Sequence, residues 1–173
     1  MPPIVSIIGK SESGKTTLIE KLIQELKRRG RRIGIIKHAS HGFDIDKKGK
    51  DSWRHKAAGA DTVMVASPGR IAMVKDVPGD CSENELDRLE KYFHDMDLVI
   101  TEGYKNAKRP KIEVFRPERH KEPVCLNDES LIAIVTDASI ETDRPIFRSN
   151  DTINLADMIE KRFLSAFNGK HKG

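Results

Sequence analysis

The sequence predicts an α/β domain built on a largely parallel sheet. Three features of the 173-residue chain carry this prediction. Short β-branched runs alternate with amphipathic segments, a glycine-rich motif joins the first run to the first helix, and a Pro-Gly turn separates one pair of apolar runs. Strands that alternate with helices pack as a parallel sheet with helices on both faces. A chain of this length can bury one core, so we expect a single domain over residues 1–173.

The order of elements follows from the spacing of apolar residues. Runs rich in Ile and Val predict strands, whereas apolar residues three and four positions apart predict helices. Ser67-Pro68-Gly69-Arg70 has proline and glycine at the central positions of a type II turn, which predicts an antiparallel hairpin insertion. The predicted strands cover residues 3–9, 32–36, 62–66, 70–74, 97–103, 111–116 and 131–137, and the predicted helices cover residues 15–29, 51–58, 82–94 and 152–167.

Composition narrows the class of protein. The 31 basic and 27 acidic residues give a net charge of +4, which suits an anionic ligand, and the few aromatic residues are not interleaved with basic ones as in nucleic-acid-binding proteins. No apolar run approaches the roughly 18 residues of a membrane helix, and no signal peptide is recognisable. We therefore expect a cytoplasmic protein that binds neither nucleic acid nor membrane. Cys81 and Cys125 lie far apart in the sequence, which favours reduced thiols.

Residues 9–16, GKSESGKT, match the pattern GxxxxGK[ST], with a predicted strand before them and an amphipathic helix after them. Glycines let successive backbone N–H groups turn inward around phosphates, and the helix N-terminus adds the positive end of its dipole. Lys15 would reach the β- and γ-phosphates, and the Thr16 hydroxyl would bind Mg²⁺. These features predict a three-layer P-loop NTPase fold. The predicted nucleotide-binding residues of the loop are Gly9, Lys10, Ser11, Glu12, Ser13, Gly14, Lys15, Thr16 and Thr17.

A P-loop site needs a second carboxylate at the end of a neighbouring parallel strand, where it holds Mg²⁺ directly or through water. Two residues compete for this role. Asp76 opens a DxxG sequence, but its strand returns from the Pro-Gly turn and should end on the wrong side. Glu102 ends a strand that follows a helix, as parallel strands do, so the expected strand direction favours Glu102.

Asp137 follows the apolar run LIAIVT at the carboxyl end of a late strand, where ligands of open α/β sheets gather. A carboxylate there could accept hydrogen bonds from N1–H and the 2-amino group of guanine. A plain cap of the strand end explains the residue equally well. The NKxD motif with which regulatory GTPases read guanine is absent from the sequence.

The loop KHASHGFDIDKKGKDS, residues 37–52, leaves the second strand at the same sheet edge and is dense in histidine and aspartate. Near a triphosphate, Asp46 could orient Mg²⁺ or water, and His38 and His41 could meet a second anion. Ordinary roles stay open, with Asp51 as the N-cap of the following helix and Asp46 as a solvated side chain. The spacing supplies no closed set of zinc ligands.

Four blocks, in this order and spacing, resemble the molybdopterin-guanine dinucleotide biosynthesis protein B (MobB) family: GKSESGKTTL, KHASHGFDIDKKGKDSWRHKAAGAD, DLVITEGYK and PKIEVFR. The resemblance covers about residues 3–116, and LIAIVTD continues it plausibly. Many families share the phosphate loop. The block rich in histidine and aspartate is specific to few proteins and is therefore the strongest evidence for the resemblance.

The resemblance implies an accessory protein that binds GTP and Mg²⁺, hydrolyses GTP weakly and assists the guanylyltransferase that joins GMP to molybdopterin. It also implies a homodimer, and it leaves direct binding of molybdopterin open. Asp46 and Glu102 would lie near Mg²⁺ with Thr16, and Lys15 would act with the two acids in catalysis. The rim of a second-ligand site would consist of Lys37, His38, His41 and Asp51.

Two rival functions also fit the residues. A P-loop kinase for a small acceptor would use Asp46 as a base and close an arginine-bearing lid from residues 104–122 over the phosphates. A nucleotide-switched binding module would use the hairpin at 62–74 as a dimer or partner surface. The basic run of residues 27–32 is either a solvated helix end, whose cations complement the helix dipole, or a site that attracts an anionic partner. The arginines of the kinase lid would be Arg109, Arg116 or Arg119.

Overall fold

The computed structural model describes residues 1–39, 42–77 and 85–165. The chain forms two compact units, which we call the sheet unit (Met1–His38 and Glu83–Gly173) and the insertion unit (Ala39–Ser82). Two such units can still fold as one domain, so the single domain expected from the length of the chain stays a prediction. Among the described residues, no helix is both long enough and apolar enough to cross a membrane.

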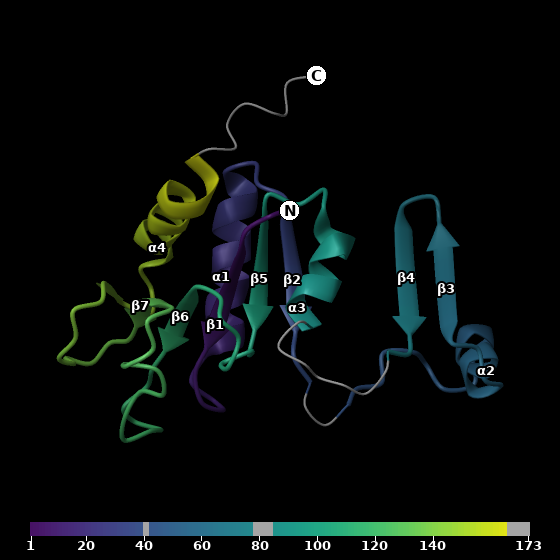
Figure 1. Cartoon of the computed structure of the whole chain (residues 1–173), viewed down its shortest axis with the longest axis horizontal. Helices are drawn as coiled ribbons and strands as arrows, with labels where there is room; N and C mark the ends of the chain where they lie inside the picture. Colours follow the sequence, from purple (N-terminus) through teal and green to yellow (C-terminus); the bar gives the residue numbers. More distant parts are fainter. Residues whose placement is uncertain (40–41, 78–84, 166–173) are drawn as a thin grey trace. The chain divides into compact units, whose positions relative to one another are not determined.

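The sheet unit is built on a six-stranded sheet with the strand order β2-β5-β1-β6-β7-β8 (Figure 1). Every pair of neighbouring strands in it is parallel. The carboxyl ends of the strands therefore meet at one edge, which we call the carboxyl edge. The strands are β1 (Ile4–Ile8), β2 (Ile33–Lys37), β5 (Leu98–Glu102), β6 (Lys111–Val114), β7 (Leu131–Val135) and β8 (Ile146–Phe147).

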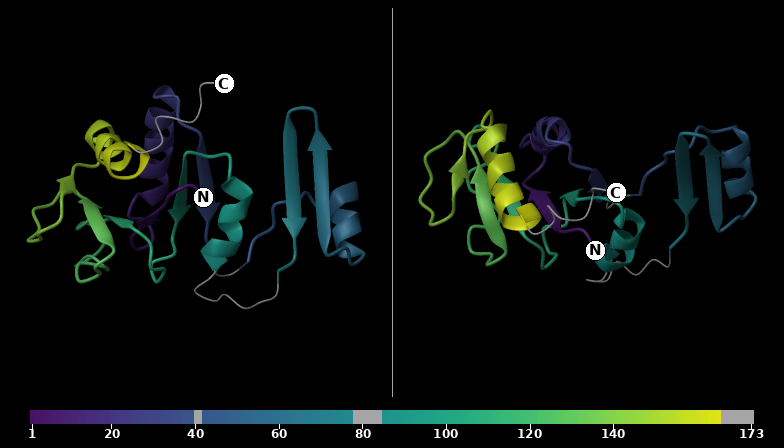
Figure 2. Two further views of the ribbon diagram at one scale, coloured as in Figure 1. Left: turned by 45° about the horizontal axis from the view of Figure 1, so that its top comes forward. Right: turned by 90° about the horizontal axis from the view of Figure 1, so that it is seen from above.

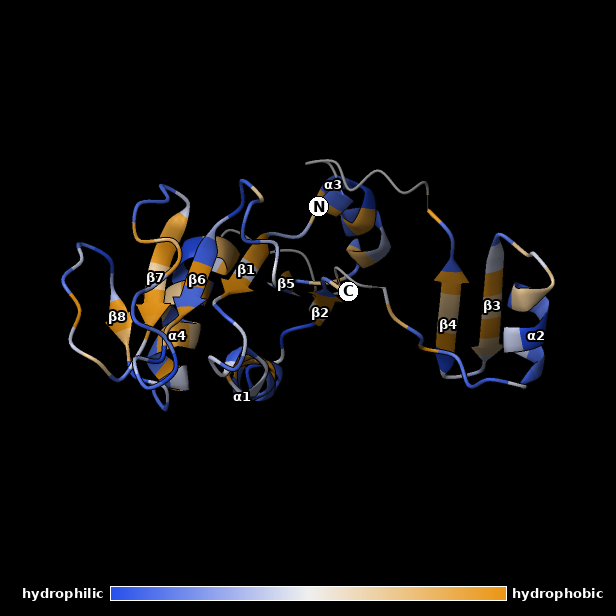
Figure 3. Ribbon diagram, turned by 90° about the horizontal axis from the view of Figure 1, so that it is seen from below, coloured by the Kyte–Doolittle hydropathy of each residue, from blue (hydrophilic) through white to orange (hydrophobic). Residues whose placement is uncertain are grey.

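Helices cover both faces of this sheet and give the three layers that the sequence predicts. These helices are α1 (Lys15–Arg28), α3 (Glu85–Leu89) and α4 (Thr152–Ile159). α1 and α4 pack together on one face (Figure 2), and α3 packs on the other (Figure 3). Residues of β1 alternate between the two cores, since Val5 packs with α1 and α4 whereas Ile4 packs with Leu86 of α3. Burial on both faces explains why the strands read as continuous apolar runs.

Three elements differ from the prediction. The helix expected over 82–94 is α3 followed by a 3₁₀ turn over Glu90–Phe93, and residues 82–84 lie outside the described residues. The helix expected over 152–167 continues from α4 as a π-helical turn over Glu160–Leu164, and its last two residues also lie outside the described residues. β8 escapes prediction because a strand of two residues shows no period.

The insertion unit contains the predicted hairpin and one short helix. β3 (Thr62–Ser67) and β4 (Arg70–Lys75) pair antiparallel, and α2 (Asp51–Ala57) packs against β3 (Figure 2). None of the described residues of this unit is buried. The described part of the unit therefore lacks a core of its own. A two-stranded hairpin without such a core is at best marginally stable in water.

A buried lysine fixes the start of β6. Lys111 is 2% exposed, and its Nζ donates to Asp128 Oδ2 at 2.6 Å and to Ser130 Oγ at 2.7 Å. Burial raises the pKa of Asp128, but the hydrogen bonds from Lys111 and Ser130 outweigh this effect and hold the pKa at about 2. Two positions on, the buried Glu113 carboxylate accepts the backbone N–H of Cys125 at 2.9 Å. The loop before β7 therefore holds β6 in place through charged groups.

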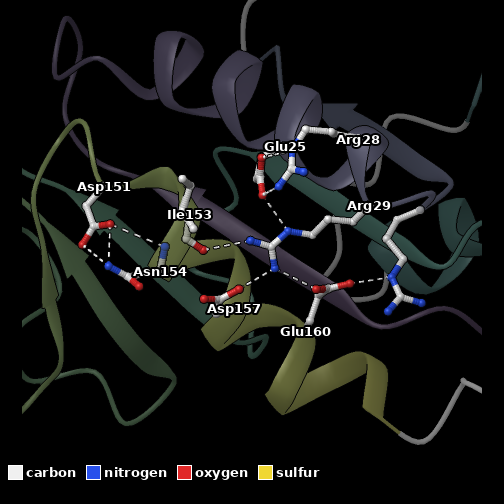
Figure 4. A network of polar contacts seen from close by, with 9 residues as sticks. Glu25, Arg28, Arg29, Asp151, Ile153, Asn154, Asp157 and Glu160 are labelled. Atoms are coloured by element: carbon white, nitrogen blue, oxygen red, sulfur yellow. Dashed lines mark hydrogen bonds and ion pairs between the residues drawn. The ribbon is translucent and has the colours of Figure 1, made fainter.

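Arginines of the basic run at the end of α1 form a network of polar contacts with residues of α4 and of the turn after it (Figure 4). The Arg29 guanidinium donates to Glu25 at 2.7 Å, to Asp157 at 2.5 Å and to Glu160 at 2.8 Å. Arg31 donates to the other oxygen of Glu160 at 2.5 Å. These bonds join the end of α1 to α4 and to the turn that follows α4. The interpretation of the run as a solvated helix end is therefore wrong for Arg29 and Arg31, because each has carboxylate partners on a distant helix.

Arg29→Ala should lower the free energy of unfolding by about 2 kcal/mol, because its carboxylate partners lose a charge-assisted donor where α1 meets α4. Arg28→Ala is the matched control. Arg28 is 69% exposed and pairs with Glu25, which Arg29 still holds, so we expect a smaller loss. Urea unfolding followed by circular dichroism measures both variants. Equal losses would contradict a special role for Arg29.

Candidate nucleotide-binding site

The sequence GKSESGKT forms a tight loop between β1 and α1 at the carboxyl edge. A Cβ at Gly9 (φ 142°) would lie 2.4 Å from the Val114 carbonyl oxygen of β6, so only glycine allows this approach. Gly14 (φ 94°) ends the loop as the N-cap of α1 in the left-handed region. Ser13 is 1% exposed, and its Oγ has no hydrogen-bond partner among the described residues. The loop presents the unpaired N–H groups and the positive dipole end of α1 at the carboxyl edge.

Lys15 is the first residue of α1, and its ammonium group lies against the loop. Its Nζ donates to the Lys10 carbonyl oxygen at 2.6 Å. Burial lowers the pKa of Lys15, whereas the charge of Glu102 raises it and the charge of Lys37 lowers it. The ammonium is therefore held among charged groups of both signs, as expected for a lysine that binds phosphate oxygens.

Glu102, the predicted second acid, contacts the phosphate loop through the hydroxyl of Thr16. The Thr16 hydroxyl donates to Glu102 Oε1 at 3.0 Å, and Lys37 Nζ lies 3.9 Å from Glu102 Oε2. A hydroxyl and a carboxylate are oxygen ligands that Mg²⁺ accepts beside phosphate oxygens and water, so this pair fits the ion. In the described ranges no group of three or more His, Cys, Asp or Glu residues could hold a metal.

The strands of the two candidate acids belong to different sheets. β5 runs parallel to β1, with Glu102 opposite Ile7, so Glu102 ends at the carboxyl edge within reach of Thr16. β4 runs antiparallel to β3, and Asp76, which follows β4, pairs with Lys56 inside the insertion unit. The structure thus places Glu102 next to the phosphate loop. Its role as a ligand of Mg²⁺ remains a prediction.

Asp137 lies beyond the end of β7 and is already hydrogen-bonded. Its carboxylate accepts the Ser149 N–H at 3.1 Å and the Ser149 hydroxyl at 2.5 Å. These two bonds lower the pKa of Asp137. The side chain thus ties the end of β7 to the chain after β8, which is the capping role. It is also exposed and retains acceptor capacity, so the role in base recognition stays open.

The end of β2 brings a histidine to the same edge. The His38 N–H donates to the Glu102 carbonyl oxygen at 3.0 Å, and its ring lies 4.7 Å from the Tyr104 ring. Tyr104 has φ 59°, a left-handed conformation that is strained for a residue with a side chain. No spacing rule singles out Tyr104 in the sequence, although it follows Glu102-Gly103 directly. The turn after β5 therefore positions both the acid and an aromatic ring.

The other predicted rim and metal residues belong to the insertion unit. Asp46 accepts the Lys47 N–H at 2.8 Å and the Ser52 hydroxyl at 3.1 Å. Asp51 is the first residue of α2, and the N-cap is Lys50, so the expectation of Asp51 as N-cap is wrong. His41 lies outside the described residues. Contributions of Asp46, His41 and Asp51 to a site remain predictions.

Comparison with known proteins identifies the family. The family model for molybdopterin guanine dinucleotide synthesis protein B, MobB, matches residues 4–137, more than half of the chain. The chain belongs to the MobB family. It is 42% identical over 169 residues to the molybdopterin-guanine dinucleotide biosynthesis adapter protein of Haemophilus influenzae, covering 96% of this chain and 92% of the relative. It is 37% identical over 162 residues to the Escherichia coli adapter protein of the same name, covering 92% of each chain.

Solved MobB structures have the same fold. The crystal structure of Bacillus subtilis MobB matches with a TM-score of 0.73 and 28% identity, over 93% of this chain and 98% of that one. A crystal structure of molybdopterin-guanine biosynthesis protein B matches with a TM-score of 0.69 and 34% identity, over 92% of this chain and 97% of that one. The resemblance and the fold class that the sequence predicts are both confirmed.

In this MobB chain the segment after β6 contacts the phosphate loop. His120 Nε2 donates to the Ser11 carbonyl oxygen at 2.8 Å, and Arg119 Nη1 lies 3.4 Å from Glu12 Oε2. No spacing rule links these positions in sequence, and the basic character of the segment is their only signal. Arg109, the third arginine of the lid considered above, pairs with α3 instead.

Lys15→Ala should weaken binding of a nucleoside triphosphate roughly 100-fold, because the ammonium makes charge-assisted bonds to phosphate oxygens. The chain should stay folded, since Lys15 faces the loop and not the core. Lys21→Ala, at an exposed position of the same helix, is the control with unchanged affinity. Calorimetry with GTP and Mg²⁺ gives the affinity, and thermal unfolding checks the fold. A folded Lys15→Ala variant with unaltered affinity would refute the phosphate-loop assignment.

Proposed function

We propose that this MobB protein is an adapter in the biosynthesis of molybdopterin guanine dinucleotide. It would act in the cytoplasm, bind GTP with Mg²⁺, and assist the guanylyltransferase that attaches GMP to molybdopterin. The observation that carries the proposal is the bond between Thr16 and Glu102 beside Lys15. Relatives of this chain are named adapters of the same biosynthesis, which supports the choice among P-loop functions.

The three side chains have separate roles on a bound triphosphate. Lys15 neutralises charge on the β- and γ-phosphates, while Thr16 and Glu102 hold Mg²⁺, which neutralises the remaining phosphate charge when bound. All three bind phosphate or metal. The GTPase activity that these groups alone support is therefore weak, which suits an accessory protein.

A second anion would bind beside the triphosphate. Lys37 brings a cation to the end of β2, and its side chain is 68% exposed next to Glu102. His38 adds an imidazole ring that lies against the Tyr104 ring at an interplanar angle of 43°. We propose that these residues form part of the rim for an anionic second ligand, with molybdopterin as the candidate.

Guanine would be read by Asp137. An ionised carboxylate accepts hydrogen bonds from both N1–H and the 2-amino group of guanine, whereas adenine offers no matching pair of donors. The bonds from Ser149 hold the carboxylate in one orientation and lower its pKa, because they stabilise the ionised form that accepts hydrogen bonds.

Calorimetric titrations with GTP and ATP, both with Mg²⁺, test the nucleotide. We expect a preference for GTP, and Asp137→Asn should weaken GTP roughly 10-fold without changing ATP, because the amide has one acceptor oxygen instead of two. Asp143→Asn, which changes an exposed carboxylate of the same loop between β7 and β8, is the control. Equal losses for GTP and ATP would contradict the base assignment. A preference for ATP, or transfer of the γ-phosphate to an acceptor other than water, would instead favour the kinase.

We also propose that the protein is a homodimer through its hairpin. Directly opposite residues of an antiparallel pair point to the same face, so the register puts Met64, Ala66, Ile71 and Met73 together on one face. Met64 is 58% exposed and Ile71 is 67% exposed. The opposite face carries Val63 and Val74, which are half-buried. Hydrophobic residues run along both strands (Figure 3), and the register places them on both faces. A surface of this kind is stabilised by an apolar partner such as a second copy.

Met64→Glu combined with Ile71→Glu should convert the dimer to monomers, because burying two carboxylates in an apolar contact is unfavourable. Arg70→Glu, which changes charge on the other face of the hairpin, is the control. Sedimentation velocity at micromolar concentration measures the mass, and GTP binding shows that the sheet unit stays folded. A wild-type chain that sediments as a monomer, or a double variant that still dimerises, would overturn the proposal.

A further inference from the structure

One arginine lies against the phosphate loop with no hydrogen bond or ion pair from its guanidinium to any described residue. Arg116 follows β6 closely, and its guanidinium lies over Gly14, since a Cβ at Gly14 would be 2.7 Å from Arg116 Nη2 and 3.0 Å from Nε. Gly14 is the N-cap of α1, so the guanidinium lies beside the N–H groups of the first turn. The side chain is exposed, and in the described part of the chain no hydrogen bond or ion pair connects its guanidinium to another residue.

This position is unfavourable for a lone cation. The helix N-terminus carries partial positive charge, and Lys15 adds a full charge one residue beyond Gly14. Elsewhere in the fold, by contrast, arginines that reach another helix are paired, as Arg29 is with three carboxylates. The buried, unpartnered Ser13 Oγ in the same loop is a second polar group that nothing described satisfies. An anion on the loop would satisfy all of these groups together.

The arginine is held in place by the turn that it begins. The Arg116 carbonyl oxygen accepts the N–H of Arg119 at 3.1 Å and of His120 at 3.0 Å. Both of these residues contact the loop, His120 through the Ser11 carbonyl and Arg119 through Glu12. Two contacts from one turn restrict how far the backbone of Arg116 can move away from the loop.

The strand order tells which part of the nucleotide Arg116 faces. β5, with Glu102, lies on one side of β1, whereas β6 and β7, with Arg116 and Asp137 after them, lie on the other. A nucleotide with its Mg²⁺ end at Glu102 and its base at Asp137 therefore crosses Arg116 between the two. Arg116 also contributes to the lowered pKa of Asp137, after the Ser149 hydrogen bonds and Arg148.

We propose that Arg116 is a nucleotide-binding residue that contacts the α- and β-phosphates of the bound nucleotide, held there by the turn of residues 116–120. The inference rests on the proposed nucleotide function and adds a specific residue and specific phosphates to it. A guanidinium presents several N–H donors in one plane, which suits two phosphate oxygens on adjacent groups. Because GTP and GDP share the α- and β-phosphates, Arg116 binds both.

Affinities for GTP and GDP, each measured by calorimetry with Mg²⁺ on the full chain, test this assignment. Arg116→Ala should weaken both nucleotides by the same factor, roughly 10- to 100-fold. Arg116→Lys should recover only part of the loss, since an ammonium cannot bind two oxygens in a plane. Lys121→Ala is the matched control, because it removes an exposed cation just beyond the turn.

Each result separates the inference from the proposed function. If Arg116→Ala binds both nucleotides like the wild type, Arg116 does not contact the nucleotide and the inference is wrong. A loss for GTP alone would put the contact on the γ-phosphate and overturn the assignment to the shared phosphates. If the wild-type chain binds neither GTP nor GDP, the proposed function is wrong, and so is the inference that rests on it. Thermal unfolding of each variant confirms that lost affinity does not reflect a lost fold.

Discussion

The close approach of the Gly9 backbone to β6 is the constraint on which the candidate site depends. Any side chain at this position would meet the Val114 carbonyl oxygen, and the start of the loop would have to move away from the strand. The chain could then no longer turn back into the N-cap of α1 at Gly14. The same approach brings the end of β6, and with it Arg116, next to the loop. One steric condition between two strand ends thus determines where the helix dipole, Lys15 and Arg116 meet.

Charge is distributed differently at this edge and in the rest of the fold. Away from the edge, buried or half-buried cations have carboxylates beside them, as Lys111 has Asp128 and Arg29 has Glu160. At the carboxyl edge, Lys15 and Lys37 share the nearby carboxylate Glu102, and a helix N-terminus adds to the positive side. A fold gains nothing in stability from such an excess of cations. The excess is explained by an anionic ligand, and the spacing of its parts along three strand ends suits an extended anion such as a nucleotide.

The fold class and the phosphate loop could be predicted because their signals are local. A strand, a GxxxxGKT sequence and a helix follow one another in the chain, and strand direction could be inferred from whether a helix or a turn precedes each strand. That reasoning favoured Glu102 over Asp76, and Thr16 does meet Glu102. The partners of Arg29 could not be inferred, because Asp157 and Glu160 lie more than a hundred residues away and no pattern links them. The contact of His120 with Ser11 is hidden for the same reason.

The two units differ in what their stability requires. The sheet unit buries apolar residues on both faces of its sheet and therefore has the core that independent stability demands. The described insertion unit buries none, yet its strands carry apolar side chains on both faces, which water alone does not favour. In the proposed dimer, association would supply part of the folding free energy of this unit. The two proposals therefore concern separate surfaces. Substitutions in the hairpin would change assembly, whereas Lys15→Ala and Arg116→Ala would change the affinity for the nucleotide.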